Sequence, residues 1–222
     1  MDVWYAIPSA NVTRANECFA KWKKMGYKTC VLIDAGKPRP DASVTDKVIE
    51  ASPYEGYYKS LIRMAEEIGL PDAIVTGGDD IYPDEGKDAA TIAGECYAKF
   101  PDGFFVMQPV GDKMDGVWRI CASPWFGKGW LRRAYGGKHP VWPGYTAFFG
   151  DTELKEVAEK LRVLWQRPDL CQYHNHWCRP GGPKKTDYQA ANDTHWKKDE
   201  RLYQSRKRSG WPGMWPKPPG VE

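Results

Sequence analysis

The sequence predicts an α/β protein in which a mostly parallel central sheet is flanked by helices, followed by an irregular, basic region rich in aromatic residues. Four short apolar runs alternate with segments of helical spacing: residues 3–8, 27–33, 73–76 and 104–108. Continuous apolar strands that alternate with helices indicate a parallel sheet covered on both faces. The alternation fails after about residue 110, where Gly, Pro and aromatic residues dominate.

The first strand and helix follow from this pattern. The run VWYAIP at Val3–Pro8 predicts a strand, and the next apolar residues share one helical face: Ala15, Cys18, Phe19, Trp22 and Met25. Asn11 can cap this helix and Gly26 can end it. The run YKTCVLI then predicts a second buried strand, which Asp34 and a Pro-rich turn close.

Two further helix and strand pairs complete the first half. An amphipathic helix over 57–68 is expected to end at Gly69, and a strand at 73–76 follows it. A last strand covers 104–108, and the helix before it has four apolar residues on one face: Ile92, Ala93, Cys96 and Tyr97.

The second half has one clear helix, whose apolar residues recur over Thr152–Trp165 before Pro168. The chain beyond it is polar and basic. We therefore divide the sequence into an α/β half at 1–110, a second half of the same domain at 111–183, and a basic, Trp- and Pro-rich extension at 184–222.

Composition excludes several classes of protein. With 41% apolar and 27% charged residues in 222, a hydrophobic core is within reach and disorder is excluded as the dominant state. No stretch approaches the roughly 20 apolar residues that span a bilayer, and the N-terminus lacks the pattern of a signal peptide. We expect a soluble, cytoplasmic protein without membrane contact, whose six scattered cysteines are reduced core residues.

Polar clusters follow three predicted strands, at Pro8–Asn11, Asp34–Gly36 and Gly77–Asp80. The carboxyl ends of parallel strands share one edge of a sheet, and ligands bind there. The adjacent carboxylates Asp79 and Asp80, preceded by glycines that let a ligand approach the backbone, suit a divalent cation that bridges to phosphate oxygens. The alternative is that the two carboxylates only shape a turn.

These segments resemble the GT-A-type nucleotide-sugar glycosyltransferases, small family-two-like enzymes with a Rossmann-like sheet. The motifs VWYAIPSAN, VLIDAG and VTGGDDIYPD stand in the family's order over roughly residues 3–110. Asp80 would bind Mn²⁺ or Mg²⁺ in such an enzyme. The resemblance also implies six contacts to a nucleotide-sugar donor, best a UDP-hexose: Pro8, Ser9, Asn11, Asp34, Gly78 and Asp79.

Within that set, the resemblance places Ser9 and Asp34 at the uracil or ribose and Asp79 at the ribose or diphosphate. Gly78 departs from the family pattern, which commonly has the first of three acids at this place. The role of Asp79 depends on how that glycine is accommodated.

A second acidic element, GDTEL at 150–154, resembles the helix start that supplies the catalytic base in inverting members of the family. A base is needed because the acceptor hydroxyl loses its proton as it attacks the anomeric carbon. Asp151 is the candidate and Glu153 the alternative. Asp151 also stands where a helix N-cap belongs, and one carboxylate can serve both purposes.

The segment CQYHNHW places two histidines on the same face of an extended chain, because alternate side chains of a strand point the same way. Neutral imidazole suits Mn²⁺ beside carboxylates. Similar glycosyltransferases carry a late His that completes the metal site, which assigns this role to His174, with His176 second. The other interpretation is that both only form hydrogen bonds at a loop edge.

Positive charge is concentrated in the second half. Residues 184–222 carry nine Lys and Arg against five acids, a net +4, whereas the whole chain has +3. Basic residues among aromatic ones suit a polyanion whose bases can stack. The candidate acceptor-binding residues lie between 117 and 139, where there is no acid: Arg119, Lys128, Trp130, Arg132, Arg133 and Lys138.

The sequence-based hypothesis is therefore a metal-dependent, inverting glycosyltransferase. Its leading acceptor is a 5-hydroxymethylpyrimidine base in DNA, such as 5-hydroxymethylcytosine, which certain bacteriophage enzymes modify and which would have to be flipped out of the helix. Two alternatives stay open. One is a glycosyltransferase acting on a saccharide or polysaccharide precursor, whose pyranose faces would stack on Trp, and the other is a non-catalytic nucleic-acid-binding protein. The sequence makes no prediction about the oligomeric state.

Overall fold

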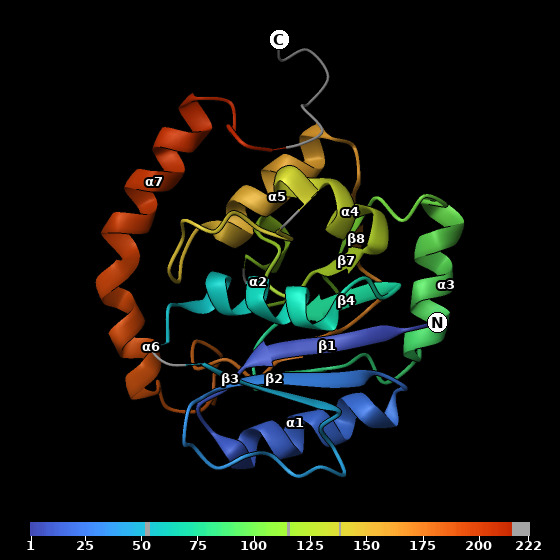
Figure 1. Ribbon diagram of the computed structural model, residues 1–222, viewed down its shortest axis with the longest axis vertical. Helices are drawn as coiled ribbons and strands as arrows, with labels where there is room; N and C mark the ends of the chain where they lie inside the picture. Colours follow the sequence, from blue (N-terminus) through green and yellow to red (C-terminus); the bar gives the residue numbers. More distant parts are fainter. Residues whose placement is uncertain (52–53, 115, 138, 215–222) are drawn as a thin grey trace.

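The computed structural model describes residues 1–51, 54–114, 116–137 and 139–214, which form a central sheet with helices on both faces (Figure 1). The seven-stranded sheet has the order β3-β2-β1-β4-β7-β6-β8, and β5 and β9 form a separate two-stranded sheet. The strands are β1 (Val3–Pro8), β2 (Lys28–Asp34), β3 (Lys47–Ala51), β4 (Ala73–Thr76), β5 (Ile81–Tyr82), β6 (Val106–Pro109), β7 (Trp125–Gly127), β8 (Leu164–Arg167) and β9 (Tyr173–His174).

Two helices pack on one face of the large sheet, α1 (Val12–Lys24) and α3 (Ala89–Lys99). The other face is covered by α2 (Tyr57–Ile68), α4 (Lys128–Arg133) and α5 (Gly150–Lys160). The long helix α7 (Trp196–Arg208) packs against α5, after the short α6 (Asp187–Asn192). Short 3₁₀ turns lie at Val117–Arg119, Ala134–Gly137 and Asp193–His195.

Strand β1 shows why the sheet is buried on both faces. Tyr5 and Ile7 belong to the core under α1 and α3, whereas Ala6 between them belongs to the core under α2. The Tyr5 ring stacks on Trp22 of α1 with centroids 3.7 Å apart. Apolar side chains on both faces of a strand produce the continuous runs that predicted a parallel sheet.

The α/β fold class and its flanked, mostly parallel sheet are confirmed. Only β7 runs antiparallel to its neighbours β4 and β6 among the paired strands of the described sheet. The predicted helix 152–165 is too long, because α5 ends at Lys160 and Arg162 takes a positive φ of 58°. The chain then turns into β8, which pairs with β6, so that residues 1–110 and 111–183 share one core.

The expectation of an irregular C-terminal region is wrong for residues 187–208, which form α6, a 3₁₀ turn and α7. Their sequence is so polar that only the buried side chains of α7 reveal its packing face: Asp199, Tyr203 and Arg206. All six cysteines are free thiols, but only four belong to the core, because Cys171 is half-buried and Cys178 is exposed. Within the described ranges, every helix is too short or too polar to traverse a lipid bilayer.

Candidate active site

The first cavity opens where β2, β1 and β4 end. These strands are parallel neighbours, so their carboxyl ends lie at one edge of the sheet. The cavity, called here the strand-end cavity, has a volume of about 440 Å³. Its wall contains all six residues assigned to the nucleotide sugar: Pro8, Ser9, Asn11, Asp34, Gly78 and Asp79.

Arg14 is a further residue of the strand-end cavity that the sequence reasoning missed. Its Nη2 lies 2.5 Å from Asp79 Oδ1 and 3.5 Å from Asp80 Oδ2. Asn11 caps α1 by accepting the Arg14 backbone N–H at 3.0 Å, which turns the first helical turn toward the cavity. An arginine three residues after a helix cap at a ligand-binding strand end was the available signal.

The two adjacent carboxylates differ in their electrostatics. Burial raises the pKa of Asp79, although Ser9 Oγ donates to its Oδ2 at 2.7 Å and Arg14 lies beside it. Burial acts in the same direction on Asp80, but the interaction with His174 and the nearby positive charge lower the pKa of that carboxyl. A Cβ atom at Gly78 would lie 2.5 Å from Asp80 Oδ1, so the glycine leaves room for this carboxylate.

The sheet of β5 and β9 brings the two histidines to Asp80. Ile81 pairs with His174, and the Asn175 N–H donates to the Asp80 carbonyl at 2.8 Å. His174 Nε2 consequently lies 3.4 Å from Asp80 Oδ1, and the His176 ring lies 4.7 Å from the His174 ring. Burial and the neighbouring His174 lower the pKa of His176, which favours its neutral form.

The chemistry of this cluster fits a divalent cation that the protein and a nucleotide bind together. In the described part of the chain, no group of three or more His, Cys, Asp or Glu side chains is arranged to hold a metal ion by itself. Asp80 and His174 offer one carboxylate and one imidazole, with His176 beside them. Such an ion would take its remaining ligands from phosphate oxygens and water, as Mg²⁺ and Mn²⁺ commonly do.

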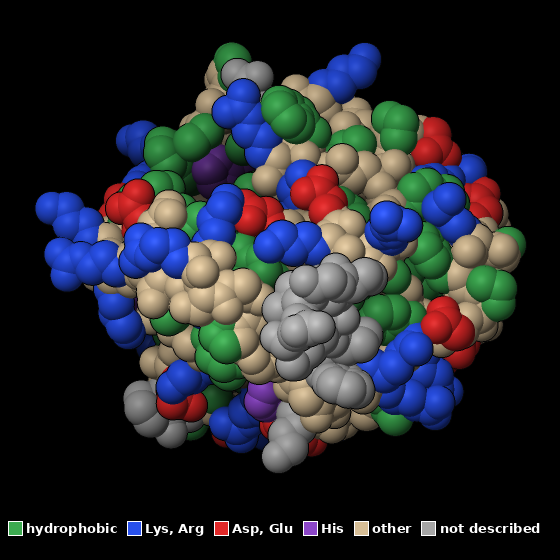
Figure 2. Space-filling model, turned by 90° about the horizontal axis from the view of Figure 1, so that it is seen from above, with side chains coloured by type: hydrophobic (Ala, Val, Ile, Leu, Met, Phe, Trp, Pro, Cys, Tyr) green, Lys and Arg blue, Asp and Glu red, His purple; other side chains and the backbone are tan. Residues whose placement is uncertain are grey.

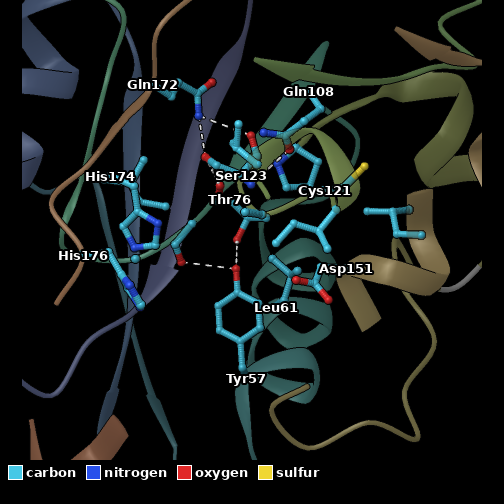
Figure 3. Close-up of a pocket in the computed structure, with 18 of the residues that line it drawn as sticks. Tyr57, Leu61, Thr76, Gln108, Cys121, Ser123, Asp151, Gln172, His174 and His176 are labelled. Atoms are coloured by element: carbon cyan, nitrogen blue, oxygen red, sulfur yellow. Dashed lines mark hydrogen bonds between the residues drawn. The ribbon is translucent and has the colours of Figure 1, made fainter. Parts of the chain in front are cut away.

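A second cavity of about 380 Å³, called here the central cavity, adjoins the first. The two cavities share six residues in their walls: Tyr57, Gly77, Gly78, Asp80, Tyr188 and Gln189. Figure 3 shows His174 and His176 on one side of the central cavity and Asp151 on the other. Much of the remaining wall is apolar, with side chains from four segments of the chain: Leu61, Met114, Val117, Ile120, Phe126, Val141, Phe148 and Leu154.

Hydrogen bonds fix several polar side chains in the wall of the central cavity (Figure 3). The Tyr57 hydroxyl donates to the Gly77 carbonyl at 3.2 Å. Gln172 Nε2 donates to the Ser123 carbonyl at 3.2 Å, and Gln108 Oε1 accepts the Ser123 N–H at 3.1 Å. Two amide side chains are thus held in place by hydrogen bonds. Sequence reasoning missed both glutamines because they stand in no recognisable motif.

Asp151 lies in the first turn of α5, and its side chain reaches the wall of the central cavity. The N-cap of this helix is Phe149 rather than Asp151, so Asp151 does not have the capping role considered from the sequence. Its backbone N–H donates to the Tyr58 hydroxyl at 3.0 Å, and a Cβ at Gly150 would lie 2.5 Å from the Tyr58 ring. Burial raises the pKa of the Asp151 carboxyl.

Glu153 does not reach either cavity, which removes it as an alternative base. Its side chain is fully buried. Arg206 of α7 donates to both carboxylate oxygens at 2.8 Å, and the Tyr145 hydroxyl donates to Oε2 at 2.7 Å. A carboxylate with these partners is saturated by structural hydrogen bonds and has no access to an acceptor.

Most of the candidate acceptor residues are at the wrong edge of the sheet. Lys128, Arg132 and Arg133 lie on α4, which follows β7. Because β7 is antiparallel to β4, its last residue Gly127 pairs with Ala73 at the start of β4, away from the strand ends that form the cavities.

Trp130 of α4 is fully buried and donates from Nε1 to the Pro140 carbonyl at 2.9 Å, so it is a core residue. Arg133 forms an ion pair with Asp102 at 2.5 Å. Arg119 remains a candidate, since it is exposed next to Trp118 and follows Val117 of the central cavity. Lys138 lies outside the described residues.

Surface charge gives no simple guide to an acceptor. On the face shown in Figure 2, Lys and Arg side chains are spread around the outline, with acidic side chains between them. The Trp residues of the second half also differ in burial. Trp125, Trp130 and Trp211 are buried, whereas Trp118, Trp177 and Trp196 are exposed.

Comparison with known proteins supports the fold. No family model and no curated protein sequence matches the chain. Among solved structures, residues 1–349 of TarS from S. aureus superpose with a TM-score of 0.54 and 9% identity, over 79% of this chain and 61% of that one. The chain therefore spans about three fifths of the TarS chain that it matches.

Two other solved structures are similar at lower scores. A197 from STIV has a TM-score of 0.46 and 14% identity, over 78% of this chain and 85% of that one. A putative glucose-1-phosphate thymidylyltransferase from Bacillus anthracis has a TM-score of 0.45 and 8% identity, over 92% and 95%. The superposition on TarS and the strand order define the protein as one with a GT-A fold.

Proposed function

We propose that this protein is a metal-dependent glycosyltransferase that moves a sugar from a nucleotide sugar, best a UDP-hexose, to an acceptor hydroxyl. The observation that carries the proposal is the meeting of the two cavities at Gly77, Gly78 and Asp80. A donor in the strand-end cavity would present its anomeric carbon at this junction. Asp151 stands across the central cavity from His174, where an acceptor hydroxyl would approach (Figure 3).

The strand-end cavity has groups for each part of a nucleotide donor. Asp34 offers a carboxylate to ribose hydroxyls or the base, and Arg14 offers a cation to the diphosphate. The rings of Tyr54 and Tyr188 lie 5.4 Å apart in the same wall, an apolar surface for a nucleobase.

Asp80 and His174, with His176 as a further donor, would hold the Mn²⁺ or Mg²⁺ ion. When bound there, the ion supplies positive charge that stabilises the leaving nucleoside diphosphate. Arg14 supplies charge to the same region independently, since its guanidinium lies beside Asp79 and Asp80. Gly77 and Gly78 line the strand-end cavity, so a phosphate there could approach their backbone closely.

Asp151 acts as the general base in this proposal. The acceptor oxygen forms a bond to the anomeric carbon, its proton passes to the Asp151 carboxylate, and the nucleoside diphosphate leaves from the opposite face. This direct displacement inverts the anomeric centre. Burial raises the pKa of Asp151, which makes its carboxylate a stronger base than that of an exposed aspartate.

For the acceptor, we propose a 5-hydroxymethylpyrimidine base in DNA, as certain bacteriophage enzymes modify. The apolar wall and the fixed amides of Gln108 and Gln172 suit a flat heterocycle with hydrogen-bonding edges. Arg119 and Lys198 are exposed near the central cavity and could contact phosphates. Lys198 Nζ donates to the Thr146 hydroxyl at 3.4 Å, and Thr146 directly precedes Ala147 of the cavity wall.

The test combines nucleotide sugars with two acceptor sets, hydroxymethylpyrimidine oligonucleotides and soluble saccharides, and detects products by mass spectrometry. We expect a hexose on the modified nucleoside, with Mn²⁺ but not with excess EDTA. Asp80→Asn should abolish transfer, whereas Asp41→Asn, which changes an exposed carboxylate between β2 and β3, should not.

The other outcomes separate the alternatives. Transfer only to saccharides would replace DNA by a carbohydrate acceptor. Full activity in EDTA would contradict the metal site. Salt-dependent DNA binding without donor binding or turnover would favour a non-catalytic nucleic-acid-binding protein.

A further inference from the structure

Helix α7 is attached to the rest of the protein through buried charged side chains. Asp199 is fully buried and Arg206 is 5% exposed. Burying a charge is costly unless it has specific partners. Arg206 has such a partner in Glu153 of α5, at 2.8 Å. Asp199 is satisfied in a different way, by the backbone of a loop.

The Asp199 carboxylate accepts hydrogen bonds from three successive backbone amides. Its Oδ2 lies 3.0 Å from Thr146 N, 2.8 Å from Ala147 N and 3.0 Å from Phe148 N. Successive N–H groups that converge in this way form a site for an anion, and charge-assisted hydrogen bonds are stronger than neutral ones. One carboxylate from α7 therefore fixes the backbone of loop 146–148.

Loop 146–148 is also part of the active site. Ala147 and Phe148 line the central cavity. The loop leads directly through Phe149 into α5, where Asp151 stands in the first turn. Phe149 takes a positive φ of 65°, a conformation uncommon for residues other than glycine, so that the orientation of the helix start depends on this junction.

Aromatic contacts strengthen the same junction. The Trp196 ring of α7 lies 4.9 Å from Phe148 and 4.8 Å from Phe149, and Tyr203 stacks on Phe149 at 5.3 Å. Trp196 and Tyr203 of α7 therefore pack on the residues that connect the wall of the central cavity to α5, the helix of Asp151.

We propose that Asp199 is a positioning residue for sugar transfer. Through loop 146–148 it sets where the Phe148 wall and the Asp151 carboxylate stand relative to the acceptor hydroxyl. This inference rests on the proposed function, in which Asp151 is the base. Misplacement of a reacting group by about 1 Å costs on the order of 10²-fold in rate, so a loosened loop slows turnover although no group that touches substrate has changed.

The test compares Asp199→Asn with Lys207→Met. Asn keeps the size of the side chain but replaces one acceptor oxygen by an NH₂ donor that opposes the loop amides. Lys207 forms an ion pair with Glu156 at 2.7 Å and so joins the same two helices. It also donates to the Tyr203 hydroxyl at 3.2 Å, but it lines neither cavity. The measurements are kcat and donor KM for transfer, UDP affinity by calorimetry, and hydrogen exchange of the amides at 146–148.

For Asp199→Asn we expect kcat to fall about 10- to 100-fold, donor KM and UDP affinity to stay within twofold, and exchange at 146–148 to accelerate. Lys207→Met should leave all four quantities unchanged. Wild-type kcat despite faster exchange, or equal losses of kcat in both variants, would overturn the inference.

Amide exchange and UDP binding need no turnover, which separates the two proposals. If the wild-type protein binds UDP but transfers no sugar to any acceptor, the proposed function fails. The loop contact is then judged by exchange alone, and unchanged protection at 146–148 in Asp199→Asn contradicts it. Should Asp199→Asn not fold, Asp199→Glu keeps the charge and shifts it by one methylene, with the same expectations.

Discussion

The strand-end cavity and the central cavity are built in different ways. The first is formed mainly by residues that directly follow β1, β2 and β4, together with the first turn of α1. The second draws its wall from strands, loops and helices spread between Tyr57 and Asn192. Strand ends are set by local sequence and parallel pairing, whereas the second arrangement depends on long-range contacts. The donor side is therefore readable from motifs and the acceptor side is not.

The largest expected effect tests whether Asp151 of the central cavity is the base for transfer from a donor bound in the strand-end cavity. Asp151→Asn should lower kcat by roughly 10²–10⁴-fold, the usual contribution of a general base, while UDP binding in the strand-end cavity stays unchanged. Glu159→Gln, an exposed carboxylate on the same helix, is the control.

Asp151 also predicts a pH dependence for kcat. Only the deprotonated carboxylate accepts a proton, and its pKa is raised above the ordinary 3.8 by burial. Wild-type kcat should therefore rise with pH through a midpoint above 3.8, and this acidic limb should be absent from the residual activity of Asp151→Asn. A midpoint below 3.8 contradicts the assignment.

The next effect concerns stability, because the second half depends on the ion pair between Glu153 and Arg206. Glu153→Gln leaves the buried guanidinium without its charged partner, and such losses cost about 3–5 kcal/mol. Urea denaturation should show this decrease in the free energy of unfolding. The exposed pair of Lys59 and Glu55 provides the control, since Lys59→Met should cost less than about 1 kcal/mol. A decrease of similar size in both variants would refute the structural role of Glu153.

A smaller effect is expected in the strand-end cavity. Arg14→Gln removes the guanidinium beside Asp79 and Asp80 and should weaken UDP binding about 10- to 100-fold, since a hydrogen bond to a charged group contributes about 1.5–3 kcal/mol. Calorimetry measures this change. Arg39→Gln breaks an exposed pair with Glu50 and should bind UDP as the wild type does. Unaltered affinity in Arg14→Gln means that the diphosphate lies elsewhere.

The smallest effect contrasts the two edges of the sheet. The double variant Arg132→Ala with Arg133→Ala changes α4, which lies away from both cavities, and its transfer activity and DNA affinity should stay within twofold of the wild type. Arg119→Ala, next to the central cavity, should weaken DNA binding and reduce its salt dependence. The opposite order of effects would place the acceptor over α4.

The sequence by itself determined the α/β class, the strands β1, β2, β4 and β6, the helices between them, and the set of polar residues at the strand ends. These features follow from short continuous apolar runs for the strands, from a periodicity of 3.6 residues and caps for the helices, and from the rule that parallel strands end at one edge. The meeting of His174 with Asp80 was expected only through resemblance, because it joins residues more than 90 positions apart, and the pairing of β5 with β9 that brings them together was not predicted.

Only the tertiary structure decided the second half. It placed Trp130 in the core, Lys128, Arg132 and Arg133 at the far edge, and Glu153 in an ion pair with α7. It also revealed the contact of Asp199 with loop 146–148. None of these follows from local spacing, since an aromatic or charged residue has the same pattern in sequence whether it faces solvent, a core or a distant partner. The direction of β7 and the packing face of α7 settle that choice, and both depend on burial against segments far away in the chain.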